Sequence, residues 1–521
     1  MSTKIKLFVI LILAFLIRSW SINSLPSLNP DEAALGYNAY SLLQTGRDEH
    51  GEAWPIHFKS FGDYKPGGYV YLALPSIKLL GLTPFAIRLP NLIFSILTIF
   101  VLYRLVLLLT FDFRLSLLSA FVLTLSPWHI HFSRGAWESN TALFFILIGL
   151  YWFYRYLLDK KWFFLFLFPL PLVISLYTYH SARLIVPVLF TTLIIFNLKK
   201  FLTKNAFLSC WLALLFILPL IISFVSIGTS RLSGVGLTAD RGPLSRSEEL
   251  LNQHPAFTYF DRVIHNKRLL YLLSWGQKYL SHFDLNFLFL TGDEVPRSKS
   301  PDMGQLYLFE LPLIILGLSF LYKQPSFPRK REPNSFKALK LFLFSFLLTA
   351  PLASSLTFQS PSALRSLSLV LPLSILTSLG LFSLKKLRHI KPLIFIVYFV
   401  SFIYFADAYF IHAPRRYPFA WNSGFSDIIP FIESQKNSFK KIYFTSKYDQ
   451  PYILYLFFSK YPPENLQSQI NLSPPDIFGF STVSTIDNIT FSIPDEIPPG
   501  SLVVDSSDLQ NTGQSFKLYI K

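Results

Sequence analysis

The chain has 521 residues, of which 52% are hydrophobic, 17% aromatic and only 15% charged, and its mean hydropathy is +0.42. Soluble domains carry about 25% charged residues, so this composition predicts a polytopic α-helical membrane protein. The net charge of +17 would suit nucleic-acid binding, but no zinc-finger spacing or RNA-binding aromatic motif accompanies it. The single cysteine, Cys210, excludes an intramolecular disulfide and gives no support for a thiol-based metal cluster.

The first apolar stretch, residues 7–17, follows Lys4 and Lys6 and ends at Arg18. It has the length of a signal peptide, but no clear small-x-small cleavage site follows it. We therefore expect an uncleaved transmembrane helix whose N-terminus is cytoplasmic, as basic residues before a span indicate.

A polar and aromatic segment, residues 19–84, comes next and contains the adjacent acids Asp31 and Glu32. Pro30 followed by two acids is typical of a helix start. A loop this long in a compact protein is usually functional. Its last part, residues 69–80, is apolar but shorter than the roughly 20 residues that a span needs, so we expect a helix at the membrane interface.

The remaining apolar stretches can be given directions from the lysines and arginines in the loops between them. With the first stretch they predict about eleven spans, a second outer segment at 229–304, and a C-terminus outside. The expected spans are 7–17, 85–109, 115–131, 141–157, 162–179, 184–198, 206–228, 306–322, 338–353, 362–384 and 392–410.

The composition changes near residue 410, and residues 411–521 contain no apolar stretch long enough to span a membrane. Short stretches at 441–445, 502–504 and 516–520 have the composition of strands, and 451–458 suits a helix. We expect residues 1–410 to form the membrane domain and 411–521 a small extracytoplasmic α/β domain.

With this topology, many unusual polar residues gather on the outer side. For each arginine alone, interfacial snorkelling explains the position, and a lone histidine is ordinarily a satisfied hydrogen-bonding residue. Acids and bases clustered on one face are better explained together as a site, because charges there are costly unless they are paired, hydrated or functional. The members are Asp31, Glu32, Asp63, Lys65, Arg88, Arg134, Glu138, His180, Arg183 and Arg365.

Such a set of side chains suits sugar transfer from a lipid-linked sugar phosphate. A carboxylate can act as general base on an acceptor hydroxyl. Lysine and arginine can stabilise the departing phosphate, arginine through bidentate contacts. The sequence has neither a Walker A motif nor a Gly-rich dinucleotide turn, which is consistent with a donor that comes from the membrane.

Five motifs carry a resemblance to a known superfamily. They are Arg18, Leu28-Asn29-Pro30-Asp31-Glu32-Ala33, Lys65-Pro66-Gly67-Gly68-Tyr69, Ala86-Ile87-Arg88-Leu89-Pro90, and Ser133-Arg134 through Glu138. In order and spacing this set resembles the GT-C glycosyltransferases, in particular the bacterial branch of protein O-mannosyltransferases and the aminoarabinose transferase of lipid A. The resemblance is strongest over residues 1 to about 200, and the C-terminal region adds little to it.

The resemblance implies an inverting transferase that uses a polyprenyl-phosphate sugar at the outer face of the cytoplasmic membrane. It implies that Asp31 is the catalytic base, with Glu32 as its neighbour in the acidic pair. Lys65 matches a lysine that contacts the donor phosphate, and Glu138 takes the place of a second acid. In the aminoarabinose branch an acid implicated in metal binding precedes that lysine, where this chain has Tyr64.

Further phosphate-binding candidates are Arg88, Arg134, Arg183 and Arg365, and Asp63, Tyr64 and His180 are additional site candidates. No metal ligand or cofactor is assigned, and assistance by a divalent cation stays open. The outer segment 229–304, with Arg262, Lys267, Arg268 and the Asp293-Glu294 pair, could cover the acceptor or be a solvated loop.

Two other classes of function compete with a transferase. A transporter or flippase of lipid-linked sugars would place its substrate groups near the bilayer midplane, whereas these charges lie at the outer rim. A membrane scaffold that binds cell-wall components would not need acids clustered with a lysine. The sequence does not identify the sugar, nor whether the acceptor is a protein, a lipid or a glycan.

Overall fold

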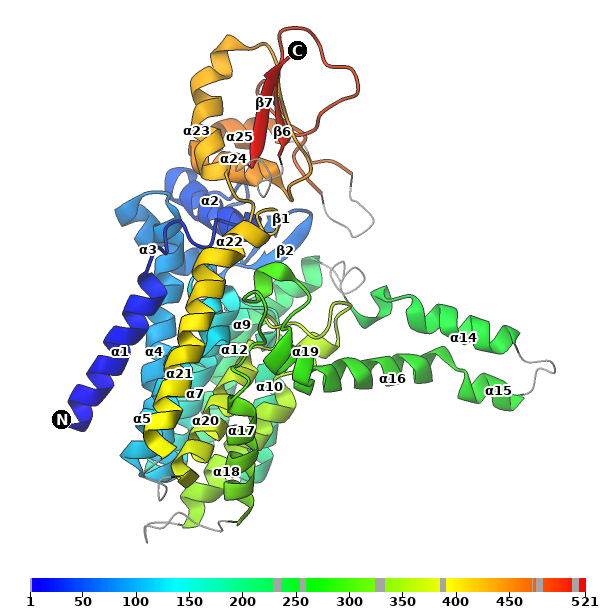
Figure 1. The fold of residues 1–521 in the computed structure, drawn as a ribbon. Coiled ribbons are helices and arrows are strands. Elements are labelled where there is room, and N and C mark those ends of the chain that lie inside the picture. Colours follow the sequence, from blue (N-terminus) through cyan, green and yellow to red (C-terminus); the bar gives the residue numbers. More distant parts are fainter. Residues whose placement is uncertain are drawn as a thin grey trace.

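The computed structural model describes residues 2–227, 236–253, 259–323, 333–384, 390–470, 472–474, 481–507 and 515–521. Long helices stand side by side in a bundle, a smaller part with a β-sheet covers one end of it, and an arm of helices projects from its side (Figure 1). Most of the two inner loops between predicted spans at 323–337 and 385–391 lies outside the described residues.

Each of the eleven predicted apolar stretches falls largely within one or more helices. These helices are α1 (Thr3–Ser19), α4 (Pro84–Thr110), α5 (Phe113–Leu125), α6 (Pro127–Ser133), α7 (Glu138–Asp159), α8 (Phe163–Leu167), α9 (Pro169–Thr178), α10 (Ala182–Phe196), α12 (Lys204–Ile227), α17 (Glu310–Lys323), α18 (Pro333–Thr349), α20 (Val370–Ser383) and α21 (Ile390–Asp407).

Fewer helices than eleven meet a strict length test for a membrane span. Among the described residues, five are long and apolar enough, or six if the bent pair α5 and α6 counts as one span. Four shorter apolar helices or helix pairs cover Gly68–Leu80, Phe163–Thr178, Ala182–Phe196 and Leu367–Ser383. The count of eleven spans therefore remains a prediction.

The stretch expected as one straight span at 115–131 is instead broken. Helices α5 and α6 meet at an angle of 62°. Between them Ser126 has extended backbone, and its hydroxyl accepts from the amide of His129. Pro127 then occupies the first position of α6, where a missing N–H costs nothing, so the local sequence starts a new helix rather than continuing the old one.

The outer layer nearest the bundle is built from the segment at 19–84. It contains α2 (Pro30–Thr45), the antiparallel hairpin of β1 (His57–Ser60) and β2 (Asp63–Pro66), and α3 (Gly68–Leu80). Helix α2 begins with a capping box, in which Asn29 and Glu32 each accept a backbone N–H of the other. The predicted helix start at Pro30 is confirmed.

A five-stranded sheet stands above this layer, with strand order β4-β5-β3-β6-β7. Its strands are β3 (Ile442–Phe444), β4 (Thr485–Ile486), β5 (Ile489–Thr490), β6 (Leu502–Ser506) and β7 (Phe516–Ile520), and its helices are α23 (Phe425–Gln435), α24 (Pro451–Ser459) and α25 (Pro463–Gln469). The three strands and the helix expected from the sequence are present. They do not pack apart from the outer layer, because one hydrophobic cluster includes Leu35 and Tyr69 together with Leu454 and Phe457.

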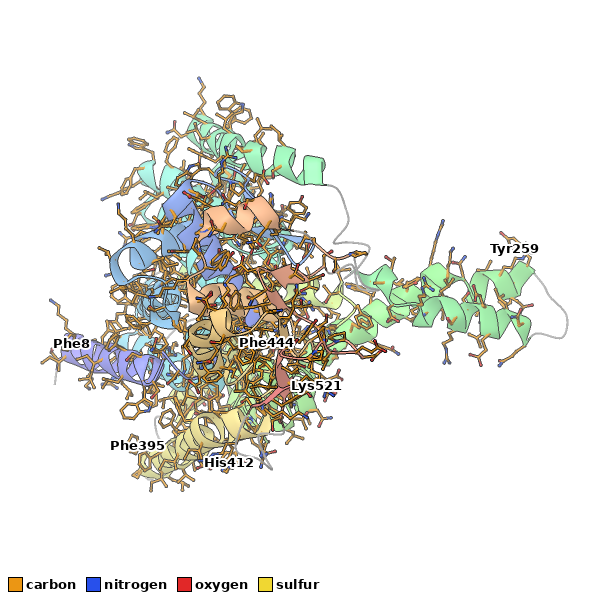
Figure 2. All side chains as sticks on the ribbon, turned by 90° about the horizontal axis from the view of Figure 1, so that it is seen from above. Phe8, Tyr259, Phe395, His412, Phe444 and Lys521 are labelled. Carbon is orange, nitrogen blue, oxygen red and sulfur yellow. The ribbon has the colours of Figure 1, made fainter. Side chains whose placement is uncertain are left out.

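The arm consists of α14 (Gly242–Asn252), α15 (Tyr259–Ile264) and α16 (Lys267–Leu280), and it projects away from the bundle in Figure 1. Seen from above in Figure 2, Tyr259 lies at its outer end. Arg262, Lys267 and Arg268 lie on this arm. The chain then returns to the bundle, where the amide of Trp128 donates to the carbonyl of Gln305.

Candidate active site

Asp31 and Lys65 form an ion pair where α2 starts and β2 ends. The ammonium of Lys65 donates to Oδ1 of Asp31, and Nη2 of Arg297 lies 3.8 Å from Oδ2. The Asp31 side chain is 36% exposed and that of Lys65 15%, so small molecules can reach the carboxylate. The ring of Phe61 lies 4.8 Å from the ammonium of Lys65 and supports its position.

Glu32, the next residue, has a different environment. Its side chain is 1% exposed and makes two contacts with Arg88, at 2.7 and 2.8 Å. It also accepts from the amides of Asn29 and Ala136. The predicted catalytic role does not fit this arrangement, because both carboxylate oxygens are buried and occupied. Glu32 instead fixes the start of α2 against the segment that leads into α7.

The donors of Arg88 are also all used in contacts within the protein. It is fully buried, and besides Glu32 it donates to the carbonyls of Ile22, Pro26 and Ser27. A guanidinium has five N–H donors, and here all five are used. In this arrangement no N–H of Arg88 is left for a donor phosphate, and Arg88 joins α4 to the loop after α1.

Arg134 has the same kind of role. It is fully buried and donates to four backbone carbonyls, those of Ile17, Arg18, Trp20 and Leu25. Carbonyls at the end of a helix lack intrahelical partners. Arg134 donates hydrogen bonds to these carbonyls at the end of α1. This geometry leaves no outward-facing terminal N–H for a phosphate, in contrast to the prediction.

The hairpin brings further predicted residues near Lys65. Successive strand residues point to opposite faces, so Asp63 shares a face with Lys65 while Tyr64 points the other way. Asp63 accepts from the amide of Tyr64 at 2.8 Å, and both side chains are partly exposed. Glu138 is the first residue of α7 and is also partly exposed, at the positive end of the helix dipole.

A second basic side chain, that of Arg183, contacts strand β1 of the hairpin. Arg183 donates to Nε2 of His57 at 2.7 Å and lies 3.5 Å from Nδ1 of His180. Burial and the neighbouring Arg183 lower the pKa of His57 to about 4, so His57 is neutral at pH 7. Its Nδ1–H therefore donates to the hydroxyl of Ser223, at 2.7 Å.

Arg365 lies near the start of α7. It donates to Thr357 Oγ1 and to the carbonyl of Gln359, at 3.2 and 3.1 Å. It also lines a small cavity together with Ser139, which follows Glu138, and Ser181, which follows His180. The chain thus brings these three predicted regions to one cavity.

Sequence reasoning missed Arg297 and His57. Arg297 reaches Asp31 from the outer segment 229–304, held there by a bond between its carbonyl and Nε2 of His131 at 2.9 Å. In the same segment Asp293 is buried and accepts from the amide of Ala363 at 2.6 Å; burial raises its pKa. No local pattern marks either Arg297 or His57, since both are recruited by contacts between segments far apart in the chain.

Metal binding finds no support in the part of the chain that the structure describes. Within those residues no three histidine, cysteine, aspartate or glutamate side chains gather closely enough to hold an ion. No metal ligand is assigned.

Comparison with known proteins was made by sequence and by structure. The profile of the dolichyl-phosphate-mannose-protein mannosyltransferase family matches residues 65–223, which include Lys65, Arg88, Arg134 and Glu138. None of the curated protein sequences matches the chain significantly.

Two solved structures represent the structural relatives. ArnT from Cupriavidus metallidurans bound to undecaprenyl phosphate has 13% identity, with a TM-score of 0.51 over 88% of this chain and 84% of that one. The oligosaccharyltransferase of Archaeoglobus fulgidus in the apo form has 12% identity and a TM-score of 0.48, covering 88% of this chain. This chain spans 64% of that archaeal protein.

The fold is therefore one that this helical chain shares with ArnT. Together with the family match, it confirms the resemblance to the GT-C glycosyltransferases that the motifs around Asp31 and Lys65 predicted.

Proposed function

We propose that this protein is an inverting glycosyltransferase that moves a sugar from a polyprenyl-phosphate donor to a hydroxyl acceptor at the outer face of the membrane. The observation that carries the proposal is the accessible ion pair of Asp31 and Lys65, beside which Arg297 adds a second cation. Other candidates from the same motifs, such as Glu32 and Arg88, are buried in mutual contacts. The pair is thus an acid and a base of this region that remain accessible for chemistry.

The geometry suits a single displacement. Asp31 accepts the proton of the acceptor hydroxyl, and the hydroxyl oxygen forms a bond to the anomeric carbon at the same time. The bond from that carbon to the phosphate oxygen breaks, and the polyprenyl phosphate leaves with the electron pair. Lys65 and Arg297 balance the charge that develops on the phosphate. When the donor phosphate engages Lys65, Oδ1 of Asp31 is released from its contact with Lys65 and can accept from the acceptor hydroxyl.

The lipid-linked donor is supported by a structural relative. ArnT was solved with undecaprenyl phosphate bound, and a donor of this kind would reach Lys65 from the bilayer along the bundle. We assign Arg183, held by His57, and Arg365 to the same phosphate-facing region, because both lie near the end of the bundle that carries the hairpin. Glu138 is the second acid of the proposed site.

Sugar transfer in membranes tests the proposal. Membranes containing wild type, Asp31→Asn or Lys65→Ala at matched levels would be supplied with a panel of labelled polyprenyl-phosphate sugars and their native acceptors. We expect transfer by the wild type and a loss of at least 100-fold in Asp31→Asn, since general base catalysis contributes about 10²–10⁴-fold. Lys65→Ala should lower the transfer rate and also raise the KM for the donor.

Glu52→Gln provides a matched control, since Glu52 is an exposed acid of the same outer segment without a proposed role. It should transfer sugar like the wild type. Full activity of Asp31→Asn would remove Asp31 from catalysis and point to Glu138. If no donor of the panel is used while the protein moves labelled lipid between leaflets, the transferase proposal fails and the flippase alternative replaces it.

A further inference from the structure

A large cavity lies at the other end of the bundle, away from the hairpin. Its volume is about 930 Å³, and α1, α5, α20 and α21 line it. Ligand pockets have volumes of about 300–1,000 Å³, so this one is at the upper end. Helix α1 contributes Lys6 from its first turns, whereas its last residues contact Arg134 beside the outer layer. The cavity and the Asp31 site therefore lie toward opposite ends of α1.

The charges that line this cavity have one sign. Among the described residues that line it are two cations, Lys6 and Arg114, and no carboxylate. Asp112, the nearest acid along the chain, forms no ion pair with Arg114 in the described part of the chain. Its Oδ1 caps α5 by accepting from the amides of Arg114 and Leu115, at 2.8 and 3.2 Å. One end of the cavity is therefore suited to an anion.

The remaining wall is apolar. Phe121, Ile394 and Phe395 contribute to it. Tyr398 also lines the cavity, but its hydroxyl donates to Oε1 of the buried Glu310 at 3.1 Å, so its ring is what remains for a ligand. A ligand that fits needs a negatively charged head and an apolar body of considerable length.

The surroundings of the cavity belong to the lipid-facing side of the bundle. In Figure 2, Phe8 of α1 and Phe395 of α21 lie on the same side of the molecule, away from Tyr259 on the arm. Both side chains are more than 60% exposed, at 63% and 64%. In a membrane protein such aromatic surface faces acyl chains, so a lipid can enter sideways between α1 and α21.

We propose that this cavity is a binding site for one anionic phospholipid of the bilayer leaflet at that end of the bundle. Lys6 and Arg114 hold its phosphate, and its acyl chains lie along Phe121 and Phe395. Basic pockets between transmembrane helices bind anionic head groups in this way. A polyprenyl-phosphate donor is a poorer occupant, because its phosphate has to reach Lys65 at the other end. The site is independent of the proposed sugar transfer.

Native mass spectrometry of the detergent-solubilised full chain tests the site, with dioleoylphosphatidylglycerol and dioleoylphosphatidylcholine as probes. We expect one phosphatidylglycerol to bind more tightly than phosphatidylcholine. Lys6→Ala combined with Arg114→Ala should weaken phosphatidylglycerol about 30-fold, since each basic residue near a membrane surface contributes about 1 kcal/mol. Phosphatidylcholine should change little.

Two further variants distinguish lipid binding in the cavity from non-specific attraction of the lipid to positive charge on the protein. Lys199→Ala combined with Lys204→Ala removes two exposed lysines that do not line the cavity, and it should leave binding unchanged. Leu118→Trp keeps both cations and fills the cavity that Leu118 lines, so it should abolish tight binding. Equal loss in the two double variants, or full binding by Leu118→Trp, would overturn the proposal. So would displacement of phosphatidylglycerol by an equimolar amount of undecaprenyl phosphate.

Discussion

At the first turn of α2, Asp31 and Glu32 leave the helix about 100° apart, as consecutive residues of any α-helix do. Glu32 therefore points to Arg88 and the protein interior, while Asp31 points to Lys65 and solvent. The adjacent acids have separate tasks for this geometric reason. Glu32 stabilises the packing of α2 against Arg88, and Asp31 stays accessible to solvent.

Removing one partner of the buried pair should damage folding. In Glu32→Gln the guanidinium of Arg88 keeps its carbonyl contacts but loses its counter-charge, and breaking a buried ion pair costs about 3–5 kcal/mol. We expect a lower yield and a midpoint of thermal unfolding several degrees below the wild type in detergent. Glu52→Gln, which changes an exposed acid, should unfold at the wild-type temperature. An unchanged midpoint in Glu32→Gln would contradict the structural role.

Glu49 makes the outer layer sensitive to pH. Burial raises the pKa of this carboxyl to about 8, although Asn38 donates to it at 3.3 Å and Lys65 favours the charged form. In the unfolded chain the pKa has its ordinary value of 4.5. The folded protein therefore holds a proton that the unfolded chain releases between pH 4.5 and 8, and stability falls as the pH rises through this range.

Glu49→Gln should remove this dependence. At pH 7 the wild type loses about 3 kcal/mol to the retained proton, because each pH unit above 4.5 costs about 1.36 kcal/mol. The variant should therefore unfold at a higher temperature than the wild type at pH 7.5 and at a similar temperature at pH 4.5. The midpoints of thermal unfolding of both proteins, measured across this pH range, test the prediction. If the difference between the two midpoints does not change with pH, Glu49 is not the group that makes stability depend on pH.

At the scale of helices and strands, the sequence predicted what depends on local pattern. The eleven apolar stretches are largely helical because a long apolar run leaves the backbone no partner but itself in a membrane. The strands β3, β6 and β7 were expected because β-branched and aromatic residues are concentrated in them. The hairpin of β1 and β2 was not expected, since its four-residue strands, His57–Ser60 and Asp63–Pro66, are short and polar.

The candidate site was predictable only in part. The motif order located Asp31 and Lys65, and the structure pairs them. The motif order could not distinguish an arginine that supports the backbone around the site from one that faces the site, because that depends on which carbonyls lie nearby. Arg88 satisfies backbone of the loop after α1, whereas Arg297, which no motif marks, reaches Asp31.

Helices α17 and α20 pack with their backbones in close approach. A Cβ added at Gly317 would lie 2.1 Å from the carbonyl oxygen of Leu376, and one at Gly380 would lie 2.0 Å from that of Leu313. Small residues allow such approach between helices in membranes. The two glycines therefore set how closely the helices pack.

Gly380→Ala should force α17 and α20 apart, and overpacking of this kind costs about 1–3 kcal/mol. We expect a lower midpoint of thermal unfolding. The matched control is Gly276→Ala in α16, where no atom lies within 4 Å of the added Cβ and alanine favours the helix by about 0.5–1 kcal/mol. Equal behaviour of the two variants would show that close packing at Gly380 does not matter.

At the scale of the whole molecule, the sheet-bearing part and the outer layer share one core. Phe457 of α24 packs against Gly36 of α2, where an added Cβ would lie 2.6 Å from its ring. The hydroxyl of Tyr37 donates to the carbonyl of Tyr461 at 2.9 Å. The helix that starts with Asp31 is therefore held from above by residues of the C-terminal region.

Phe457→Ala should loosen α2 as well as its own domain. Truncating a buried phenylalanine costs about 3–5 kcal/mol, and we expect earlier thermal unfolding together with faster hydrogen exchange in residues 30–45. Phe431→Ala alters a phenylalanine that is 43% exposed and should do neither. Faster exchange confined to the C-terminal region would mean that the two parts are energetically separate.

This shared core has a consequence for biosynthesis. Tyr37 and Tyr461 are 424 positions apart, and at about 5–20 residues per second a ribosome needs roughly 20–85 s to make the intervening chain. During that time α2 has been made, but the aromatic cover that holds it does not yet exist. The Asp31–Lys65 pair can therefore reach its final environment only late in synthesis, which delays any chemistry at this site until the surrounding helices have been made.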